Sequence, residues 1–103
     1  MSVIEEIAAE RQRQIKAEGW TSVHDDTHTG GELPRAAAAY AWHASREFVD
    51  RLSYYHIANI PKMWPWSISW WKPKNPRRDL IRAAALLVAE IERLDRAAKE
   101  PPA

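Results

Sequence analysis

The chain has 103 residues and carries 15 lysines and arginines against 14 aspartates and glutamates, which leaves a formal charge of +1 at neutral pH. General nucleic-acid binders and proteins of anionic membrane surfaces need a clear cationic excess, so this balance argues against both classes. The absence of cysteine excludes disulfides, thiolate metal sites and cysteine nucleophiles. The longest apolar run, residues 83–89, is far too short to span a bilayer, and we expect a soluble cytoplasmic protein.

The length predicts one helical domain over residues 1–98, followed by a polar tail over residues 99–103. The first helix is expected to begin after Ser2, because Ser2 and Glu5 have the spacing of a capping box, and to end at Gly19. Its apolar residues recur at helical spacing. They are Ile4, Ile7, Ala8 and Ile15.

The second helix is predicted to begin near Thr29, because Thr29 and Glu32 repeat the capping-box spacing and Pro34 then falls in the first turn. Its apolar stripe is rich in alanine, which lets a neighbouring helix approach closely. The stripe consists of Leu33, Ala36, Ala37, Tyr40, Ala41, Ala44 and Phe48.

The third helix is expected to have Asn75 as its cap and Pro76 at its first position, and to run to about Arg96. Apolar residues at alternating steps of four and three predict a seam for packing against another helix. The seam consists of Leu80, Ala84, Leu87, Ile91 and Leu94. The wider apolar surface around it indicates contact with two neighbours or with another subunit.

These elements predict an all-α fold of three main helices with a long, ordered loop rich in tryptophan and proline. Three short helices enclose little core, so we expect a homo-oligomer. The loop connects the second and third helices, and its second half, residues 61–74, holds four of the six tryptophans and three of the seven prolines.

The tryptophan-rich loop is the first candidate binding site. Its tryptophans are Trp64, Trp66, Trp70 and Trp71, and the cations beside them are Lys72, Arg77 and Arg78. An indole face stacks on a nucleobase with about 1–3 kcal/mol, and the cations would pair with phosphates. A nucleotide-like ligand is therefore one hypothesis. The alternatives are that the indoles plug the end of a helical bundle or form a protein or subunit interface.

The second candidate lies between the first two helices, in a segment dense in imidazole and carboxylate groups. Its residues are Trp20, His24, Asp25, Asp26 and His28. Three hypotheses remain open: a hydrogen-bonded junction that caps the second helix, the polar wall of a ligand pocket, or a metal site. The metal alternative assigns His24, Asp25, Asp26, His28 and Glu32 as ligands for Mg²⁺, Mn²⁺ or Zn²⁺.

Nucleophilic catalysis by serine is not predicted. The three glycines, at positions 19, 30 and 31, form no Gly-x-Ser-x-Gly elbow, Walker loop or dinucleotide fingerprint, and no catalytic residue is assigned. The pair His43 and Glu47, four apart on the second helix, is more typical of a solvated surface than of a metal site.

Several short strings are distributed over nearly the whole chain. They are Ala9–Gln14, Glu18–Thr21, His24-Asp25-Asp26-x-His28, Gly31–Leu33, Trp64–Trp66, Trp70–Pro73, Arg77–Leu80 and Ala89–Arg96. Together they resemble a family of small proteins encoded by tailed phages and prophages. The resemblance implies a phage protein, and phage proteins of this size include inhibitors of host defence that oligomerise and sequester nucleotide immune signals. If the chain is similar, the aromatic and basic loop would hold such a ligand.

The chain is also similar, more weakly, to all-α nucleoside-triphosphate pyrophosphatases of the MazG type. Those enzymes hold magnesium with Glu-x-x-Glu and Glu-x-x-Asp pairs, whereas Glu6 and Glu10 here are four apart and Asp79 is followed by an arginine and alanines. We therefore expect non-catalytic binding of a small phosphorylated or nucleotide-like ligand in phage–host conflict. Metal-dependent pyrophosphohydrolysis and inhibition of a host defence protein are the alternatives.

Overall fold

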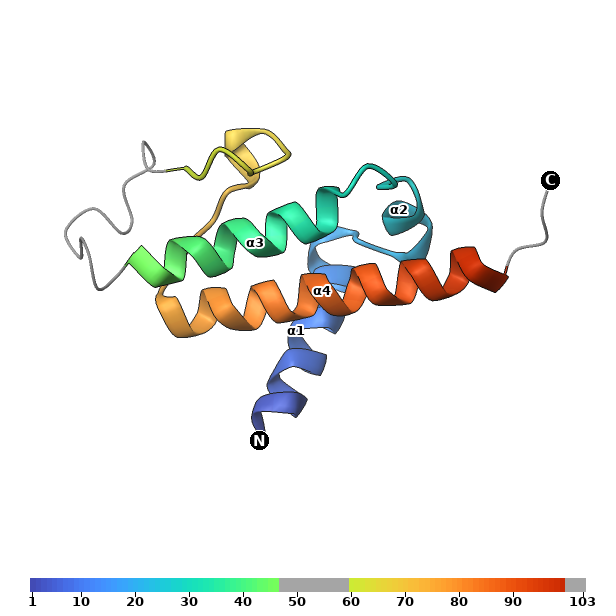
Figure 1. Ribbon diagram of the computed structural model, residues 1–103. Coiled ribbons are helices and arrows are strands. Elements are labelled where there is room, and N and C mark those ends of the chain that lie inside the picture. The colour runs from blue at the N-terminus through green and yellow to red at the C-terminus, as the bar shows by residue number, and fades with distance from the viewer. Residues whose placement is uncertain (47–59, 100–103) are drawn as a thin grey trace.

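The computed structural model describes residues 1–46 and 60–99. Within these ranges it is helical and contains no strand, which confirms the all-α prediction. The elements are α1 (Val3–Glu18), α2 (Ser22–Asp26), α3 (Glu32–Ser45), the 3₁₀ helix η4 (Ile68–Trp70) and α4 (Pro76–Lys99). α3 and α4 run antiparallel side by side, and α1 crosses α4 (Figure 1). The short helix α2 was not expected from the sequence.

Helix α1 begins and ends as predicted, but polar residues make up much of the face that it buries. Ser2 and Glu5 exchange both hydrogen bonds of the capping box, and Gly19 ends the helix with a φ of 73°. The predicted apolar face is confirmed only in part: Ile4, 74% exposed, and Ala8 face outward, whereas Ile7 and Ile15 are partly buried. The buried residues of α1 are Glu10, Arg11 and Gln14. Ion pairs rather than apolar packing therefore attach much of this helix.

The predicted start of α3 at a Thr29 capping box is wrong. Gly31 is the N-cap, with a φ of 84° and no side-chain hydrogen bond to the helix end. The residues upstream form α2 instead, capped by the Thr21 hydroxyl, which accepts the His24 N–H at 3.3 Å. The chain then turns through residues 27–31, and the left-handed conformation at its last residue requires a glycine.

Helices α3 and α4 meet through small residues. Ala36, Ala39 and Ala85 have no exposed surface, and side chains of this size allow two helix backbones to approach closely. The predicted α3 stripe is confirmed at the buried residues Leu33, Ala36, Ala37, Tyr40 and Ala44. It is wrong at Ala41, which is exposed, and Phe48 lies outside the described residues.

Helix α4 begins as predicted, because Asn75 Oδ1 accepts the Arg78 N–H at 2.8 Å. It continues to Lys99, beyond the expected end, and residues 100–103 of the predicted tail lie outside the described part of the chain. The predicted seam does not pack inside the protomer, since its four large residues are exposed. They are Leu80, Leu87, Ile91 and Leu94. The inward face carries Ile81, Ala83, Ala85, Leu86 and Ala89, and its three alanines suit close approach of α3.

Two tryptophans of the loop complete the core over α3. The Trp71 ring stacks on Tyr40 with centroids 4.7 Å apart, and Trp64 contacts the same ring edge-on at 5.5 Å. His43, expected on a solvated surface, is buried with its ring 5.3 Å from Trp71, while its suggested partner Glu47 lies outside the described residues. None of the helices described here is long and apolar enough to cross a membrane.

Candidate functional site: an indole-lined pocket

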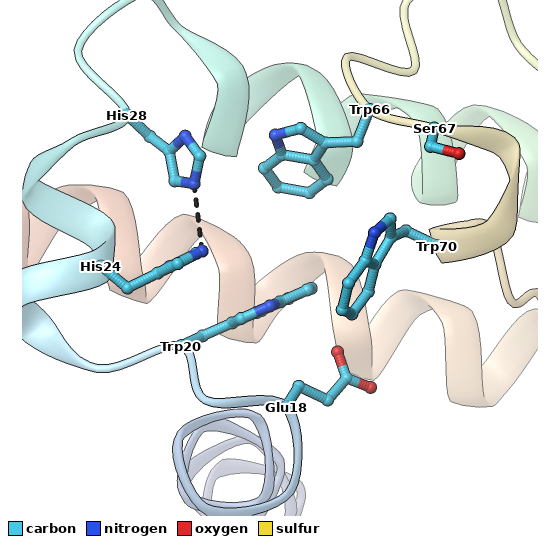
Figure 2. Close-up of a pocket in the computed structure, with 7 residues that line it drawn as sticks. All are labelled: Glu18, Trp20, His24, His28, Trp66, Ser67 and Trp70. Atoms are coloured by element: carbon cyan, nitrogen blue, oxygen red, sulfur yellow. Dashed lines mark hydrogen bonds between the residues drawn. The ribbon is translucent and has the colours of Figure 1, made fainter.

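A pocket of about 400 Å³ opens where the end of α1, helix α2 and the tryptophan-rich segment meet (Figure 2). It is lined by Glu18, Trp20, His24, His28, Trp66, Ser67 and Trp70. Pockets for small ligands usually measure a few hundred cubic ångströms and combine apolar walls with a few polar groups. This cavity has both properties.

Three indoles form the apolar walls. Trp20 is 9% exposed and lies 5.7 Å from Trp66, ring centroid to ring centroid, at an interplanar angle of 50°. Trp66 in turn meets Trp64 edge-on at 5.3 Å, so the core supports it from behind. Trp70 is 45% exposed at the mouth of the pocket. The walls therefore include a buried indole, Trp20, and an accessible one, Trp70.

The loop that carries Trp66 and Trp70 is held by local hydrogen bonds. The Trp64 indole N–H donates to the Ser67 carbonyl oxygen at 3.1 Å, and the backbone N–H of Trp70 donates to the same oxygen at 3.0 Å. The Ser67 hydroxyl caps η4 by accepting the Ser69 N–H at 3.3 Å. The positions of the two outer indoles are thereby tied to the buried Trp64.

Two histidines form the polar wall opposite Trp70. Their Nε2 atoms lie 3.2 Å apart. The ring of His24 is parallel to Trp20, with an interplanar angle of 3° and centroids 6.2 Å apart, and the His28 ring lies 5.4 Å from Trp66. Aromatic neighbours on both sides therefore hold the two imidazoles in place.

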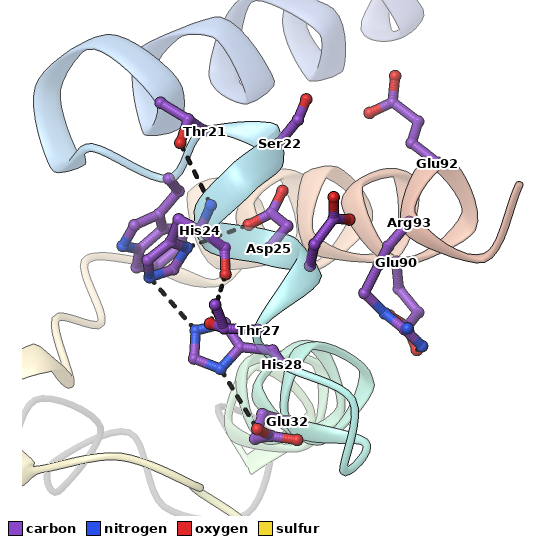
Figure 3. Close-up of polar contacts among 12 residues, drawn as sticks. Thr21, Ser22, His24, Asp25, Thr27, His28, Glu32, Glu90, Glu92 and Arg93 are labelled. Carbon is purple, nitrogen blue, oxygen red and sulfur yellow. Dashed lines mark hydrogen bonds and ion pairs between the residues drawn. The ribbon is translucent and has the colours of Figure 1, made fainter. Parts of the chain in front are cut away.

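Each histidine is oriented by a carboxylate on its other nitrogen (Figure 3). His24 Nδ1 lies 3.3 Å from Asp25 Oδ1, and His28 Nδ1 lies 3.3 Å from Glu32 Oε2. A backbone hydrogen bond lowers the pKa of Glu32 below its ordinary value, and the hydrogen bond to His28 acts in the same direction. Glu32 thus contributes to this wall as a charged acceptor behind His28.

The two aspartates of the predicted site point away from the pocket. Asp25 is fully buried and accepts from Arg11 at 2.8 Å, while Asp26 accepts from Arg96 at 2.8 Å on the surface. The hypothesis that this segment caps the helix that follows is wrong, because Gly31 is the N-cap of α3 and no side chain caps that helix. Among residues 1–46 and 60–99 no group of three or more His, Asp or Glu side chains could hold a metal ion.

The predicted cations are not gathered at the pocket. Arg77 pairs with Glu6 at 2.8 Å, and Arg78 pairs with Glu10. The hydrogen bond with Arg77 lowers the pKa of Glu6 and raises that of Arg77. Lys72 comes nearest, with Nζ 5.5 Å from the ring centroid of Trp70.

Of the predicted ligand-binding residues, the structure therefore brings Trp20, His24, His28, Trp66 and Trp70 together. It places Trp64 and Trp71 in the core instead.

No family model, curated protein or solved structure matches this chain. The pocket must therefore be interpreted from its own chemistry.

Two lining residues were missed by the sequence analysis. Glu18 lies at the pocket edge, where Arg13 donates to its Oε1 at 3.1 Å, and Ser67 lies between the two outer indoles. Glu18 directly precedes the glycine that ends α1, so its proximity to Trp20 was a usable signal. Ser67 offered none, because its place depends on the fold of the whole loop.

Proposed function

We propose that this protein binds a small ligand with a flat heteroaromatic ring, of nucleotide type, in the indole-lined pocket and does not transform it. The observation that supports the proposal is that Trp20 meets Trp66 and Trp70, which come from a distant segment of the chain, in one cavity. Each indole face offers about 1–3 kcal/mol of stacking energy to a nucleobase. A cavity of about 400 Å³ has room for a nucleotide-sized ligand.

The polar lining would orient such a ligand. The Glu18 carboxylate can accept N–H groups from a base edge, and the Ser67 hydroxyl can donate or accept. Lys72, beside Trp70 at the mouth, is placed to meet a phosphate outside the pocket. Arg77 and Arg78 are less suited to this role than the sequence indicated, because Glu6 and Glu10 already neutralise them.

Binding is favoured over pyrophosphohydrolysis because the acidic side chains that would hold magnesium already form hydrogen bonds with arginines. Glu6 and Glu10 would supply the carboxylates of a MazG-type magnesium site, but each accepts hydrogen bonds from arginines. A magnesium ion would have to displace those guanidinium groups. Tight binding without turnover is also what sequestration of a host defence signal requires, which is the role in the host cytoplasm that the phage resemblance implies.

We propose further that the protein is a homo-oligomer assembled through α4. The seam Leu80, Ala84, Leu87, Ile91 and Leu94 repeats at steps of four and three, and its large residues are exposed in the protomer. A seam of this spacing fits the same seam on a second helix, so a second copy of the chain is the occupant that matches it. The face spans about 21 Å of helix at 1.5 Å per residue.

The ligand proposal can be tested with a panel of cyclic dinucleotides, ADP-ribose derivatives and nucleoside triphosphates. Binding should quench the tryptophan fluorescence and raise the melting temperature. At a ligand concentration about 100 times the dissociation constant, the folded protein should gain about 2.7 kcal/mol of stability. Chromatography should then recover the ligand unchanged. Recovery of a hydrolysed product would establish the enzyme alternative, and capture of a host protein with no nucleotide effect would favour the inhibitor alternative.

A further inference from the structure

The two imidazoles in the pocket wall form part of a longer chain of polar groups. The order is Asp25, His24, His28, Glu32, with separations of 3.3 Å, 3.2 Å and 3.3 Å between successive polar atoms (Figure 3). The two histidines meet through Nε2, and each turns Nδ1 to a carboxylate. The chain therefore begins and ends on an acceptor.

This arrangement determines where the hydrogens lie. An ionised carboxylate only accepts, so both Nδ1 atoms must carry a hydrogen. A neutral imidazole has a single N–H, which leaves a lone pair on the Nε2 of His24 and another on the Nε2 of His28. These lone pairs lie on the facing sides of the two rings, with the Nε2 atoms 3.2 Å apart. They repel unless a cation binds to both, and that cation is either a proton on the line between the nitrogens or a metal ion to one side of that line.

The geometry fits a metal ion. A Zn–N bond measures about 2.0–2.1 Å, so two nitrogens at adjacent corners of a zinc tetrahedron are about 3.3 Å apart. The Nε2 separation of 3.2 Å is close to that edge. Metal-binding histidines also commonly donate their other N–H to a carboxylate, which sets the tautomer and directs the lone pair. Asp25 is fixed in that orienting role, because Arg11 holds its second oxygen at 2.8 Å.

We propose that His24 and His28 bind one divalent transition-metal ion such as Zn²⁺ through their Nε2 atoms. Imidazole nitrogen suits Zn²⁺ and its neighbours better than Mg²⁺ or Mn²⁺, which prefer oxygen. Two protein ligands leave coordination positions open to the pocket, for water or for an oxygen of a bound ligand. The metal site does not depend on the proposed function, whereas coordination of a nucleotide phosphate by the ion rests on it.

The wall is preorganised and accessible. Trp20 lies parallel to the His24 ring, and Trp66 packs against His28, so few side-chain rotations remain to be restricted when an ion binds. The His24 side chain is 35% exposed and that of His28 is 18% exposed. An ion can therefore reach both nitrogens from the pocket without unfolding the site.

The test is titration of protein lacking any polyhistidine tag with ZnCl₂, followed by calorimetry and native mass spectrometry. The wild type should bind one ion per chain. His24→Phe and His28→Phe keep a flat ring against Trp20 and Trp66 but lack the ligand nitrogen, so Zn²⁺ affinity should fall by more than about tenfold. Glu32→Ala removes an orienting carboxylate and should weaken binding by about 10- to 100-fold. Asp26→Asn, beside the site but paired with Arg96, is the matched control and should bind as the wild type does.

Absence of Zn²⁺ binding by the wild type, or undiminished binding by both phenylalanine variants, would overturn the site. Nitrogen-15 NMR of the wild-type histidine side chains gives an answer without any variant. Zn²⁺ should shift the Nε2 resonances of His24 and His28 and leave those of the other histidines unchanged, and the reverse pattern would also overturn the site.

Nucleotide titrations in EDTA test the proposed function separately. Nucleotide binding without Zn²⁺ binding overturns only the metal site, and Zn²⁺ binding without nucleotide binding overturns only the proposed function.

Discussion

Arg11 Nη2 donates a hydrogen bond to Asp25 Oδ2 at 2.8 Å, and the two side chains are 7% and 0% exposed. The same guanidinium donates to the Trp20 carbonyl oxygen at 3.2 Å and to Glu92 at 3.1 Å. One side chain of α1 thereby ties together the turn after it, helix α2 and helix α4. Because Asp25 orients His24 with its other oxygen, this ion pair also supports the pocket wall.

Asp25→Ala should lower the free energy of unfolding by about 3 kcal/mol, the lower end for breaking a buried ion pair, because Arg11 loses its buried partner and keeps only the half-exposed Glu92. Urea denaturation followed by circular dichroism measures the loss. Asp26→Ala is the control one residue away, because its ion pair with Arg96 is exposed and should contribute no more than about 1 kcal/mol. Equal losses in the two variants would contradict the structural role given to Arg11.

Trp70→Ala should weaken nucleotide binding by roughly 5- to 150-fold, the equivalent of about 1–3 kcal/mol of lost stacking. The measurement is a fluorescence or calorimetric titration with whichever nucleotide the panel identifies. Trp42 on α3 is the matched control, being exposed to a similar degree, 41% against 45%, but not lining the pocket. Trp42→Ala should change affinity by no more than about twofold. A comparable loss in both variants would show that the pocket is not the binding site.

Leu87→Glu or Ile91→Glu should reduce the molar mass in solution, because a charge on the exposed seam of α4 cannot be buried against a second copy without a large desolvation cost. Light scattering coupled to size-exclusion chromatography reports the mass directly. Val23→Glu, also at an exposed apolar position but on α2, should leave the mass unchanged. A wild type that elutes as a monomer at all concentrations would rule out assembly through this face.

Glu10 should contribute stability that depends on pH. Burial raises the pKa of Glu10, but the hydrogen bond and charge of Arg13 and the charge of Arg78 outweigh it, so the pKa lies below its ordinary value of 4.5. A carboxylate whose pKa is lower in the folded than in the unfolded chain stabilises the fold above the unfolded value. That stabilisation is lost as the pH falls through the folded value.

The corresponding measurement compares wild type and Glu10→Gln by urea denaturation between pH 7 and pH 3. The difference in unfolding free energy should be largest near neutral pH and shrink on acidification. A difference that stays constant over this range would mean that the ionisation of Glu10 is not linked to folding.

Local signals in the sequence predicted where a helix begins or ends when the capping atoms lie within one turn of the helix end. The Ser2 capping box, the glycine stop at residue 19 and the Asn75 cap are all of this kind. The Thr29 cap failed because the residues before it form α2, a five-residue helix too short to show a periodic pattern, and α3 then begins after Gly31.

The sequence by itself determined that the chain is helical, where α1 and α4 begin, and that an aromatic-rich segment precedes α4. Periodicity could not determine which face of α4 turns inward, because Leu87 and Leu86 belong to two apolar faces of the same helix and only the alanines opposite, on α3, favour one of them. Tertiary structure alone decided that Trp66 joins Trp20 in a pocket while Trp64 enters the core, and that Glu6 and Glu10 neutralise the two arginines. The physical reason is range: capping depends on atoms a few residues apart, whereas the partner of a buried charge or ring is whichever side chain the packed helices bring beside it.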